Sequence, residues 1–165
     1  MDLTNPMHIA TKSSKIDITL EKDTKSISQK ISNYLSKGDI VFFYGEIGVG
    51  KTTFIKHLIN YKQSKLNKKI TEVPSPTFNI LYEYKIDELI IQHYDLYRVK
   101  NDMELKNIAI FENQQDSITL IEWPEIIKEK PKNIIELNFN YEENLNKRHL
   151  IISSNYKKEI FNEFK

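Results

Sequence analysis

The glycines of this chain gather in one short stretch whose spacing is typical of a phosphate-binding loop. Three of the four, Gly45, Gly48 and Gly50, precede Lys51 and Thr52 directly. The pattern Gly-x-x-x-x-Gly-Lys-Thr is a Walker A loop, in which glycines let backbone N–H groups point inward at phosphate oxygens. Its lysine reaches the β and γ phosphates, and its threonine hydroxyl ligates Mg²⁺. The predicted nucleotide-binding residues here are Gly45, Glu46, Ile47, Gly48, Val49, Gly50, Lys51, Thr52 and Thr53.

Two carboxylates are candidates for the chemistry that the loop alone cannot perform. Phosphoryl chemistry requires Mg²⁺, which needs hard oxygen ligands beside the Thr52 hydroxyl. Glu122 ends the apolar run 117–121 in the manner of a Walker B acid, and we expect Thr52 and Glu122 to be the metal ligands. The expected catalytic residues are Lys51, Asp95 and Glu122, with Asp95 positioning water. The alternative for either acid is a solvated carboxylate at a strand end.

The residues around Asp95 carry weaker signals. His93, Tyr94 and Tyr97 are interpreted as core or surface residues, because such side chains are more often structural than catalytic. Arg98 is interpreted as a partner of Asp95 or as a residue that faces the phosphates.

An α/β fold is required to bring the loop and the acids together. Residues 40–44 are β-branched and aromatic without charge, which predicts a strand buried on both faces. A helix that begins near Gly50 points its N-terminal N–H groups at the phosphates. A parallel strand at 117–121 beside the loop strand delivers Glu122 to the metal. We expect a P-loop NTPase-like three-layer α/β fold, with a central sheet of mixed parallel and antiparallel strands and flanking helices.

Periodicity and turn residues predict the remaining elements. Residues 16–20 alternate as a strand, and the next helix is capped at Asp23 or Thr24 and stopped by Gly38. Further strands are predicted at 78–84, 89–95, 134–139 and 149–153, the first two as an antiparallel hairpin, with helical pieces at 102–106 and at the C-terminus. Residues 1–15 are polar and without period. We expect 1–15 to be a flexible leader and 16–165 to be a single domain.

Composition excludes several classes of function. The formal charge of +1 gives no basic field, so a general nucleic-acid binder is not indicated and no DNA partner is expected. The chain has no cysteine, which excludes disulfides and thiol chemistry and is consistent with a cytoplasmic location. No apolar run approaches the length of a membrane span, so no membrane partner is expected.

Four motifs in one order make the chain resemble the TsaE (YjeE) family. They are Gly-Glu-Ile-Gly-Val-Gly-Lys-Thr-Thr at 45–53, Ser-Pro-Thr-Phe at 75–78, His-Tyr-Asp-Leu-Tyr-Arg at 93–98 and Glu-Trp-Pro-Glu at 122–125. That family is the P-loop ATPase of bacterial tRNA threonylcarbamoyladenosine synthesis. The resemblance implies that ATP and Mg²⁺ are the cofactors and that the chain acts on the TsaB–TsaD complex. It also implies that tRNA is met only through that complex.

The resemblance further implies roles for single residues. Residues 75–78 resemble a switch-like segment near the γ-phosphate, and Trp123 is expected near the partner surface. Thr52 and Glu122 match the family's metal residues, and Asp95 matches its required aspartate. Additional nucleotide contacts are implied for Asp23, Glu125 and Arg148.

Three other functions share a phosphate loop. A small nucleoside or metabolite kinase is disfavoured because such enzymes clamp the phosphoryl group with several arginines, and this chain has only Arg98 and Arg148. A GTPase is disfavoured because residues 67–70, Asn-Lys-Lys-Ile, lack the acid of a guanine-reading motif. A nucleotide-dependent binding protein with little turnover is the third alternative.

Overall fold

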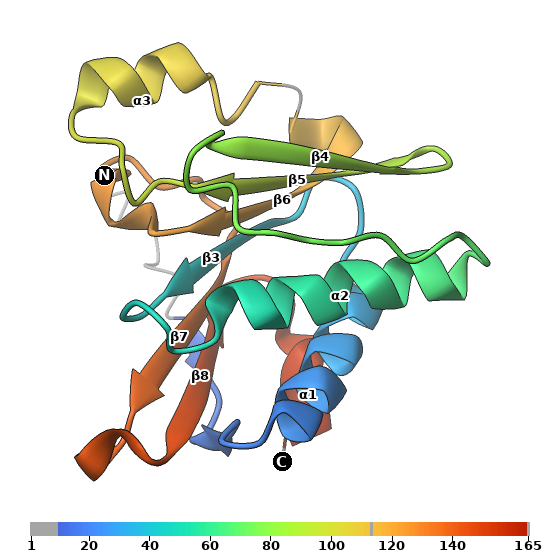
Figure 1. Cartoon of the computed structure of the whole chain (residues 1–165), viewed down its shortest axis with the longest axis vertical. Helices are drawn as coiled ribbons and strands as arrows, with labels where there is room; N and C mark the ends of the chain where they lie inside the picture. The colour runs from blue at the N-terminus through green and yellow to red at the C-terminus, as the bar shows by residue number, and fades with distance from the viewer. Residues whose placement is uncertain (1–9, 113, 165) are drawn as a thin grey trace, which may run out of the picture.

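The computed structural model describes residues 10–112 and 114–164, which form one eight-stranded sheet with helices on both faces (Figure 1). The strands lie in the order β1-β8-β7-β3-β6-β5-β4, and β2 pairs with β8 beside that path. Three-residue 3-10 helices and a longer one, Lys158–Phe164, connect or end the elements. The strands and helices are β1 (Thr11–Lys12), β2 (Ile16–Asp17), α1 (Glu21–Tyr34), β3 (Ile40–Tyr44), α2 (Lys51–Lys65), β4 (Leu81–Ile86), β5 (Leu89–Asp95), α3 (Asp102–Ile108), β6 (Ser117–Glu122), β7 (Ile135–Tyr141) and β8 (Arg148–Ser154).

The sheet mixes parallel and antiparallel pairing, as the sequence predicts. Strand β3 lies between β6 and β7 and is parallel to both, and β5 is parallel to β6. Strands β4 and β8 pair antiparallel on either side of these strands, with β4 and β5 forming the predicted hairpin. In this register Phe43 pairs with Glu122, and Glu122 pairs with Asp95. The C-terminal ends of three parallel strands therefore meet beside the loop that follows β3.

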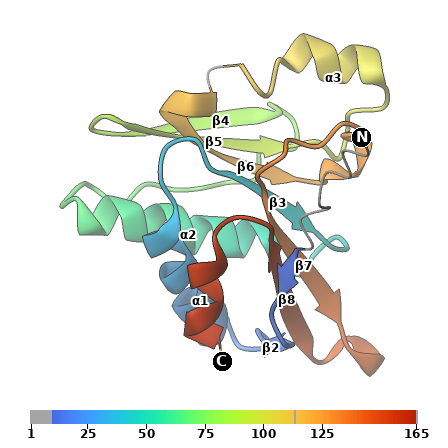
Figure 2. The same ribbon diagram turned by 180° about the vertical axis from the view of Figure 1, so that it is seen from behind.

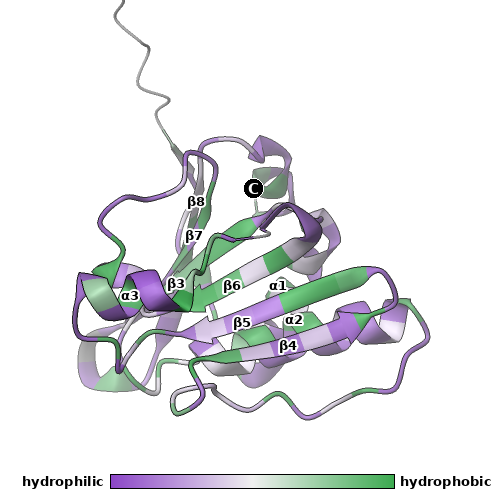
Figure 3. Ribbon diagram, turned by 90° about the horizontal axis from the view of Figure 1, so that it is seen from above, coloured by the Kyte–Doolittle hydropathy of each residue, from purple (hydrophilic) through white to green (hydrophobic). Residues whose placement is uncertain are grey.

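The central strands are buried on both faces, which gives the expected three layers. Helices α1 and α2 lie side by side on one face, where Phe43 packs against Phe54 of α2. On the other face Phe42 belongs to a second apolar cluster that includes partly buried residues of α3. Figure 3 shows the hydrophobic colouring concentrated in β3 and β6. The predicted buried side of α2, formed by Phe54, Ile55, Leu58 and Ile59, is confirmed.

Two predicted boundaries near the N-terminus were wrong. The strand predicted at 16–20 is only Ile16–Asp17, because the Asp17 carboxylate accepts the Thr19 N–H and turns the chain. Helix α1 then begins at Glu21, with Leu20 at the N-cap position, instead of being capped by Asp23 or Thr24. The hydroxyl of Thr24 donates to the carbonyl of Ile18. The helix ends at Tyr34, before Gly38.

The strand predicted at 78–84 begins later, at Leu81. Phe78 is 84% exposed, and Ile80 has a left-handed φ of 67°. The N–H of Ile80 donates to the carbonyl of Pro76, so the chain after the two prolines closes a turn before it extends. Alternating apolar residues alone do not reveal such a turn.

The first and the last described segments are tied to the sheet and to α1. Thr11 and Lys12, which fall in the predicted leader, form β1 and pair with β8, whereas positions 1–9 lie outside the described residues. The C-terminal segment is a 3-10 helix beside α1 (Figure 2), where Tyr34 donates to Glu163. Helix α3 begins at the predicted Asp102 because the Asn101 side chain accepts two backbone N–H groups of its first turn.

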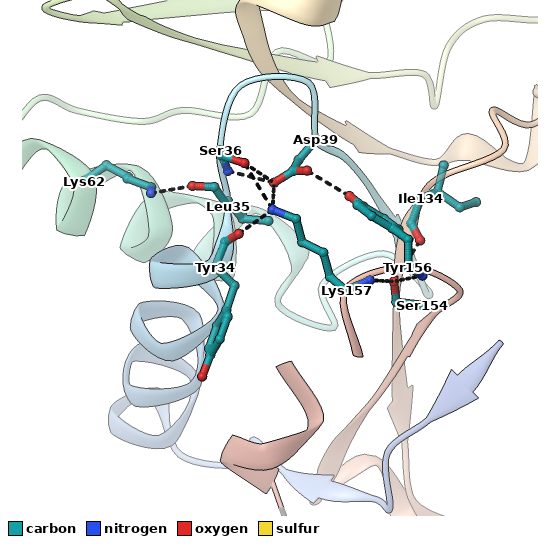
Figure 4. A network of polar contacts seen from close by, with 9 residues as sticks. All are labelled: Tyr34, Leu35, Ser36, Asp39, Lys62, Ile134, Ser154, Tyr156 and Lys157. Carbon is teal, nitrogen blue, oxygen red and sulfur yellow. Dashed lines mark hydrogen bonds and ion pairs between the residues drawn. The ribbon is translucent and has the colours of Figure 1, made fainter. Parts of the chain in front are cut away.

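A partly buried polar network holds the C-terminal segment against the start of β3 (Figure 4). The ammonium of Lys157 forms an ion pair with Asp39 and donates to the carbonyl of Tyr34 at 2.6 Å. The same Asp39 carboxylate accepts the Ser36 N–H at 2.7 Å and the Tyr156 hydroxyl at 3.0 Å. Burial, and then the Asp39 charge, raise the pKa of Tyr156. The network lies at the end of β3 opposite to the loop at 45–50.

Within the described residues, no helix combines the length and the apolar character that crossing a membrane requires.

Candidate functional site

The loop between β3 and α2 has the backbone that its glycines predict. Gly45, Gly48 and Gly50 have φ values of 137°, 76° and 115°, which residues with a Cβ atom rarely adopt. A Cβ atom on Gly45 would lie 2.6 Å from the carbonyl oxygen of Phe139. Gly50 is the N-cap of α2 in a left-handed conformation, so the first N–H groups of that helix face the loop.

Lys51 extends along the inside of the loop and is only 5% exposed. Its ammonium group donates to the carbonyls of Gly45 at 2.6 Å and Glu46 at 2.9 Å, and lies 3.9 Å from the centre of the Trp123 ring. Burial lowers the pKa of Lys51, whereas the nearby carboxylates, Glu122 foremost, act in the opposite direction. The charge is thus held close to the loop backbone, where phosphate oxygens bind in Walker A loops.

Thr52 and Glu122 meet, as the parallel pairing of β3 and β6 requires. The Thr52 hydroxyl lies 2.9 Å from Oε1 and 3.0 Å from Oε2 of Glu122, whose side chain is almost fully buried. The predicted place of Glu122, at the end of a buried strand beside the loop strand, is therefore confirmed. Its role as a metal ligand stays a prediction.

The site would hold Mg²⁺ with few protein ligands. In the part of the chain that the structure describes, no group of three or more His, Asp or Glu residues is arranged to bind a metal. Mg²⁺ at nucleotide sites is held by one or two protein oxygens together with phosphates and water. One hydroxyl and one carboxylate, from Thr52 and Glu122, fit that mode of binding.

Asp95 is buried and held by hydroxyl groups from the segment that precedes β4. Its Oδ2 accepts from Ser75 at 2.8 Å and from Thr77 at 2.6 Å, and its Oδ1 accepts the N–H of Tyr97 at 3.0 Å. The sequence motif at 75–78 indicated a segment near the phosphates, but the two hydroxyls bonded to Asp95 were not among the predicted site residues. The available signal in the sequence was that Ser75 and Thr77, two hydroxyl residues, lie two positions apart within the motif.

Sequence reasoning also missed the position of His93. The residue is a core residue, as interpreted, but its Nε2 lies 2.8 Å from Oε1 of Glu122. His93 and Asp95 share one face of β5 because side chains alternate along a strand. The signal in the sequence was that His93, a polar residue, lies two positions before the predicted catalytic Asp95 and so on the same face of the strand.

Two adjoining cavities lie over the loop. The first, of about 310 Å³, is lined by Ile47, Gly48, Gly50, Lys51, Thr52, Thr53, Ser75, Thr77, Asp95, Tyr97, Glu122 and Trp123. The second, of about 450 Å³, is lined by Gly45, Glu46, Ile47, Tyr97, Trp123 and Glu125. Most of the predicted nucleotide-binding residues and both predicted acids therefore line one continuous region.

The remaining predicted contacts lie apart from these two cavities. Arg148 donates to the carbonyls of Val49 at 3.4 Å and Thr19 at 2.7 Å, so it joins the loop to the chain before α1. Asp23 lies in the first turn of α1 and lines neither cavity. Arg98 neither contacts Asp95 nor lines the cavities; its guanidinium carbon lies 4.9 Å from the centre of the Phe78 ring.

Comparison with known proteins gives consistent matches. The family model "Threonylcarbamoyl adenosine biosynthesis protein TsaE" matches residues 18–150. The protein of Rickettsia conorii named tRNA threonylcarbamoyladenosine biosynthesis protein TsaE is 38% identical over 138 residues, 83% of this chain and 76% of that protein. The Aquifex aeolicus protein of the same name is 35% identical over 115 residues, 70% of this chain and 78% of that protein.

A solved structure confirms the fold. The crystal structure of Bacillus subtilis YdiB superposes with a TM-score of 0.71 over 95% of this chain and 96% of that one, at 22% identity. A sheet of mixed strand direction with flanking helices is thus found in a second protein of low identity.

Proposed function

Since this chain belongs to the TsaE family and so to the biosynthesis of threonylcarbamoyladenosine in tRNA, we propose that it acts there as a Mg²⁺-dependent ATPase. One observation carries the proposal: the start of α2 and the ends of β5 and β6 bring Lys51, Thr52, Asp95 and Glu122 to one cavity. ATP hydrolysis at a phosphate loop uses these groups: a lysine ammonium, a hydroxyl and two carboxylates.

The residues fit ATP and Mg²⁺ in distinct ways. The N–H groups of the loop and of the first turn of α2 bind phosphate oxygens, and Lys51 exchanges its two loop carbonyls for the β and γ phosphates. Thr52 and Glu122 hold the metal. When bound, Mg²⁺ neutralises the negative charge that develops on the phosphate oxygens during hydrolysis.

Asp95 is the residue we assign to the attacking water. Its carboxylate ends β5 next to Glu122, and it can accept a proton from water while Ser75 and Thr77 keep it oriented. Release of these hydroxyl contacts would couple the chemistry to the segment 75–78. Phe78 is exposed on that segment, so a movement of the segment would change the molecular surface.

The partner we propose is the TsaB–TsaD complex, in the cytoplasm, with tRNA bound only by that complex. The net charge of +1 provides no field that would bind bare tRNA at physiological salt. Two large apolar side chains are exposed, Ile47 in the phosphate loop and Phe78 next to the hydroxyl of Thr77 that holds Asp95, as expected where a protein partner docks. A metabolite kinase is disfavoured because Arg148 is committed to backbone carbonyls and Arg98 to Phe78.

The test is reconstitution with purified components. We expect ATP binding that is stronger with Mg²⁺ than with EDTA, slow hydrolysis by the protein alone, and faster hydrolysis with TsaB–TsaD. Repeated rounds of threonylcarbamoyladenosine formation should require the protein, and tRNA binding by the protein alone should be weak.

The matched control is Lys51→Ala, which removes the one side-chain charge inside the loop. It should lose tight ATP binding and fail to support repeated rounds of modification while keeping the fold. Modification that proceeds equally well with this variant, or transfer of phosphate to a small metabolite, would overturn the proposal.

A further inference from the structure

His93 is a polar side chain placed where an apolar one would pack at lower cost. It is 0% exposed, on the face of β5 that α2 covers, and the preceding residues on that face, Leu89 and Ile91, are apolar. Burial of a polar ring is unfavourable unless its nitrogens find partners. Among the described residues, its one hydrogen-bond partner is Glu122, and its Nδ1 has none. The residue is therefore placed for its contact with Glu122.

The two oxygens of Glu122 are held unequally. Oε1 is contacted by Thr52 at 2.9 Å and by His93 at 2.8 Å, whereas Oε2 is contacted only by Thr52 at 3.0 Å. The Thr52 hydroxyl has a single hydrogen and so cannot donate to both oxygens at once. His93 is thus the donor that fixes the rotation of the carboxylate, and Oε2 is left without a second donor.

The orphaned Nδ1 determines which nitrogen carries the proton. A proton on Nδ1 would be a buried N–H without an acceptor, and Nε2 would then face a carboxylate oxygen with a lone pair. A proton on Nε2 instead donates to Oε1 of Glu122. The tautomer with hydrogen on Nε2 is the one that this geometry supports.

We propose that His93 is a positioning residue, which holds Glu122 through Oε1 so that Oε2 is presented beside the Thr52 hydroxyl as a one-oxygen ligand for Mg²⁺. The inference rests on the proposed function in that Thr52 and Glu122 bind the metal. Partners behind a metal ligand set its orientation, and their loss typically lowers metal affinity about 10–100-fold. His93 does not itself line the cavity and reaches it only through Glu122, so we expect its effect to be on the metal and not on the phosphate loop.

The experiment compares three variants that differ in where they place a donor. His93→Gln extends an amide nitrogen to the region of Nε2, His93→Asn ends near Nδ1 and falls short of Glu122, and His93→Leu keeps the volume without a donor. The measurement is the affinity for a non-hydrolysable ATP analogue by calorimetry, once in Mg²⁺ and once in EDTA. The ratio of the two affinities isolates the metal from the nucleotide.

We expect His93→Asn and His93→Leu to lower this ratio about tenfold or more, with affinity in EDTA close to that of the parent. His93→Gln should recover most of the ratio. An unchanged ratio in His93→Asn or His93→Leu would overturn the inference. So would an equal loss in EDTA and in Mg²⁺ for all three variants, which would mark a packing defect.

A second readout uses the parent protein without nucleotide, metal or substitution. Nitrogen-15 NMR of the His93 imidazole should show the proton on Nε2, and a proton on Nδ1 alone would overturn the inference. This test needs no variant, so it holds even if the variants fail to fold. If the parent binds the analogue equally in Mg²⁺ and EDTA, the proposed function fails at the metal, whereas the NMR result still tests the contact with Glu122.

Discussion

The Thr52 hydroxyl and the Glu122 carboxylate lie 2.9 Å apart across 70 positions of sequence. Two features set this distance. The parallel pairing of β3 and β6 puts Glu122 beside Phe43, and the loop 45–50 returns the chain so that α2 starts above the same strand ends. The contact is therefore built by the sheet register and by the loop conformation together, and each can be perturbed separately.

Removal of the Thr52 hydroxyl should affect Mg²⁺-dependent nucleotide binding alone. Thr52→Ala removes one oxygen ligand and leaves the loop N–H groups unchanged, so we expect about a tenfold loss of affinity in Mg²⁺ and little change in EDTA. Calorimetry in the two buffers measures both. Thr52→Ser is the control because it keeps the hydroxyl, and a variant Thr52→Ala with parental affinity in Mg²⁺ would exclude Thr52 as a ligand.

Substitution of Gly45 should destabilise the fold itself. In Gly45→Ala the new Cβ meets the carbonyl oxygen of Phe139 at 2.6 Å in a backbone with φ of 137°, so we expect a loss of about 2–4 kcal/mol in unfolding free energy. Gly38→Ala is the matched control, because Gly38 also has a positive φ but a Cβ atom there would meet nothing within 4 Å. Urea unfolding of both variants checks the difference. Equal losses would mean that backbone strain, and not the contact with Phe139, is what the glycine avoids.

The elements that position the site were predictable from local patterns. Residues 40–44 and 117–121 are short apolar runs that end directly at the loop and at Glu122, and the structure confirms both strands and their parallel pairing. Hairpin β4–β5 was also predicted, since a two-residue acidic turn, Asp87 and Glu88, separates its strands. In each case a local signal coincided with the tertiary arrangement.

Contacts that depend on several distant elements were not predictable. His93 looked like any core histidine until the β5–β6 register placed it against Glu122, and the two hydroxyls that hold Asp95 reach it only because Pro76 and the left-handed Ile80 fold the segment back. Similarly, Thr11 and Lys12 form a strand because β8 offers an edge. Such placements follow from tertiary pairing, which one sequence does not reveal.

Neutralisation of Asp95 should suppress hydrolysis more than binding. Asp95→Asn keeps the shape and can still accept from Ser75 or Thr77, but it cannot take a proton from water, so we expect kcat to fall about 100-fold with ATP affinity nearly unchanged. Phosphate release measures kcat, and calorimetry measures the affinity for ATP. Asp116→Asn, at an exposed position, is the control. A parental kcat would leave Asp95 with a structural role only.

Removal of the Lys157 charge should loosen the C-terminal segment without altering the nucleotide site. Lys157→Met leaves the buried Asp39 with three donors, the N–H and hydroxyl of Ser36 and the hydroxyl of Tyr156, but without its ion-pair partner, so we expect a loss of about 2–3 kcal/mol in unfolding free energy. Lys158→Met, next to it and exposed, should cost little. Thermal and urea unfolding compare the pair. ATP affinity should remain parental in both, since the network lies at the far end of β3.

Trp123 should report on nucleotide binding through its fluorescence. It is the only tryptophan in the chain, and its ring lies 3.9 Å from the Lys51 ammonium and 4.8 Å from the Tyr97 ring. Binding of ATP draws the Lys51 charge from the loop carbonyls toward phosphate and adds negative charge beside the ring. We therefore expect a change in emission that saturates with ATP and is absent in Lys51→Ala. Calorimetry verifies that ATP is bound. If the emission then stays constant at saturating ATP, Lys51 keeps its place over Trp123 when the nucleotide binds, contrary to the role assigned to it.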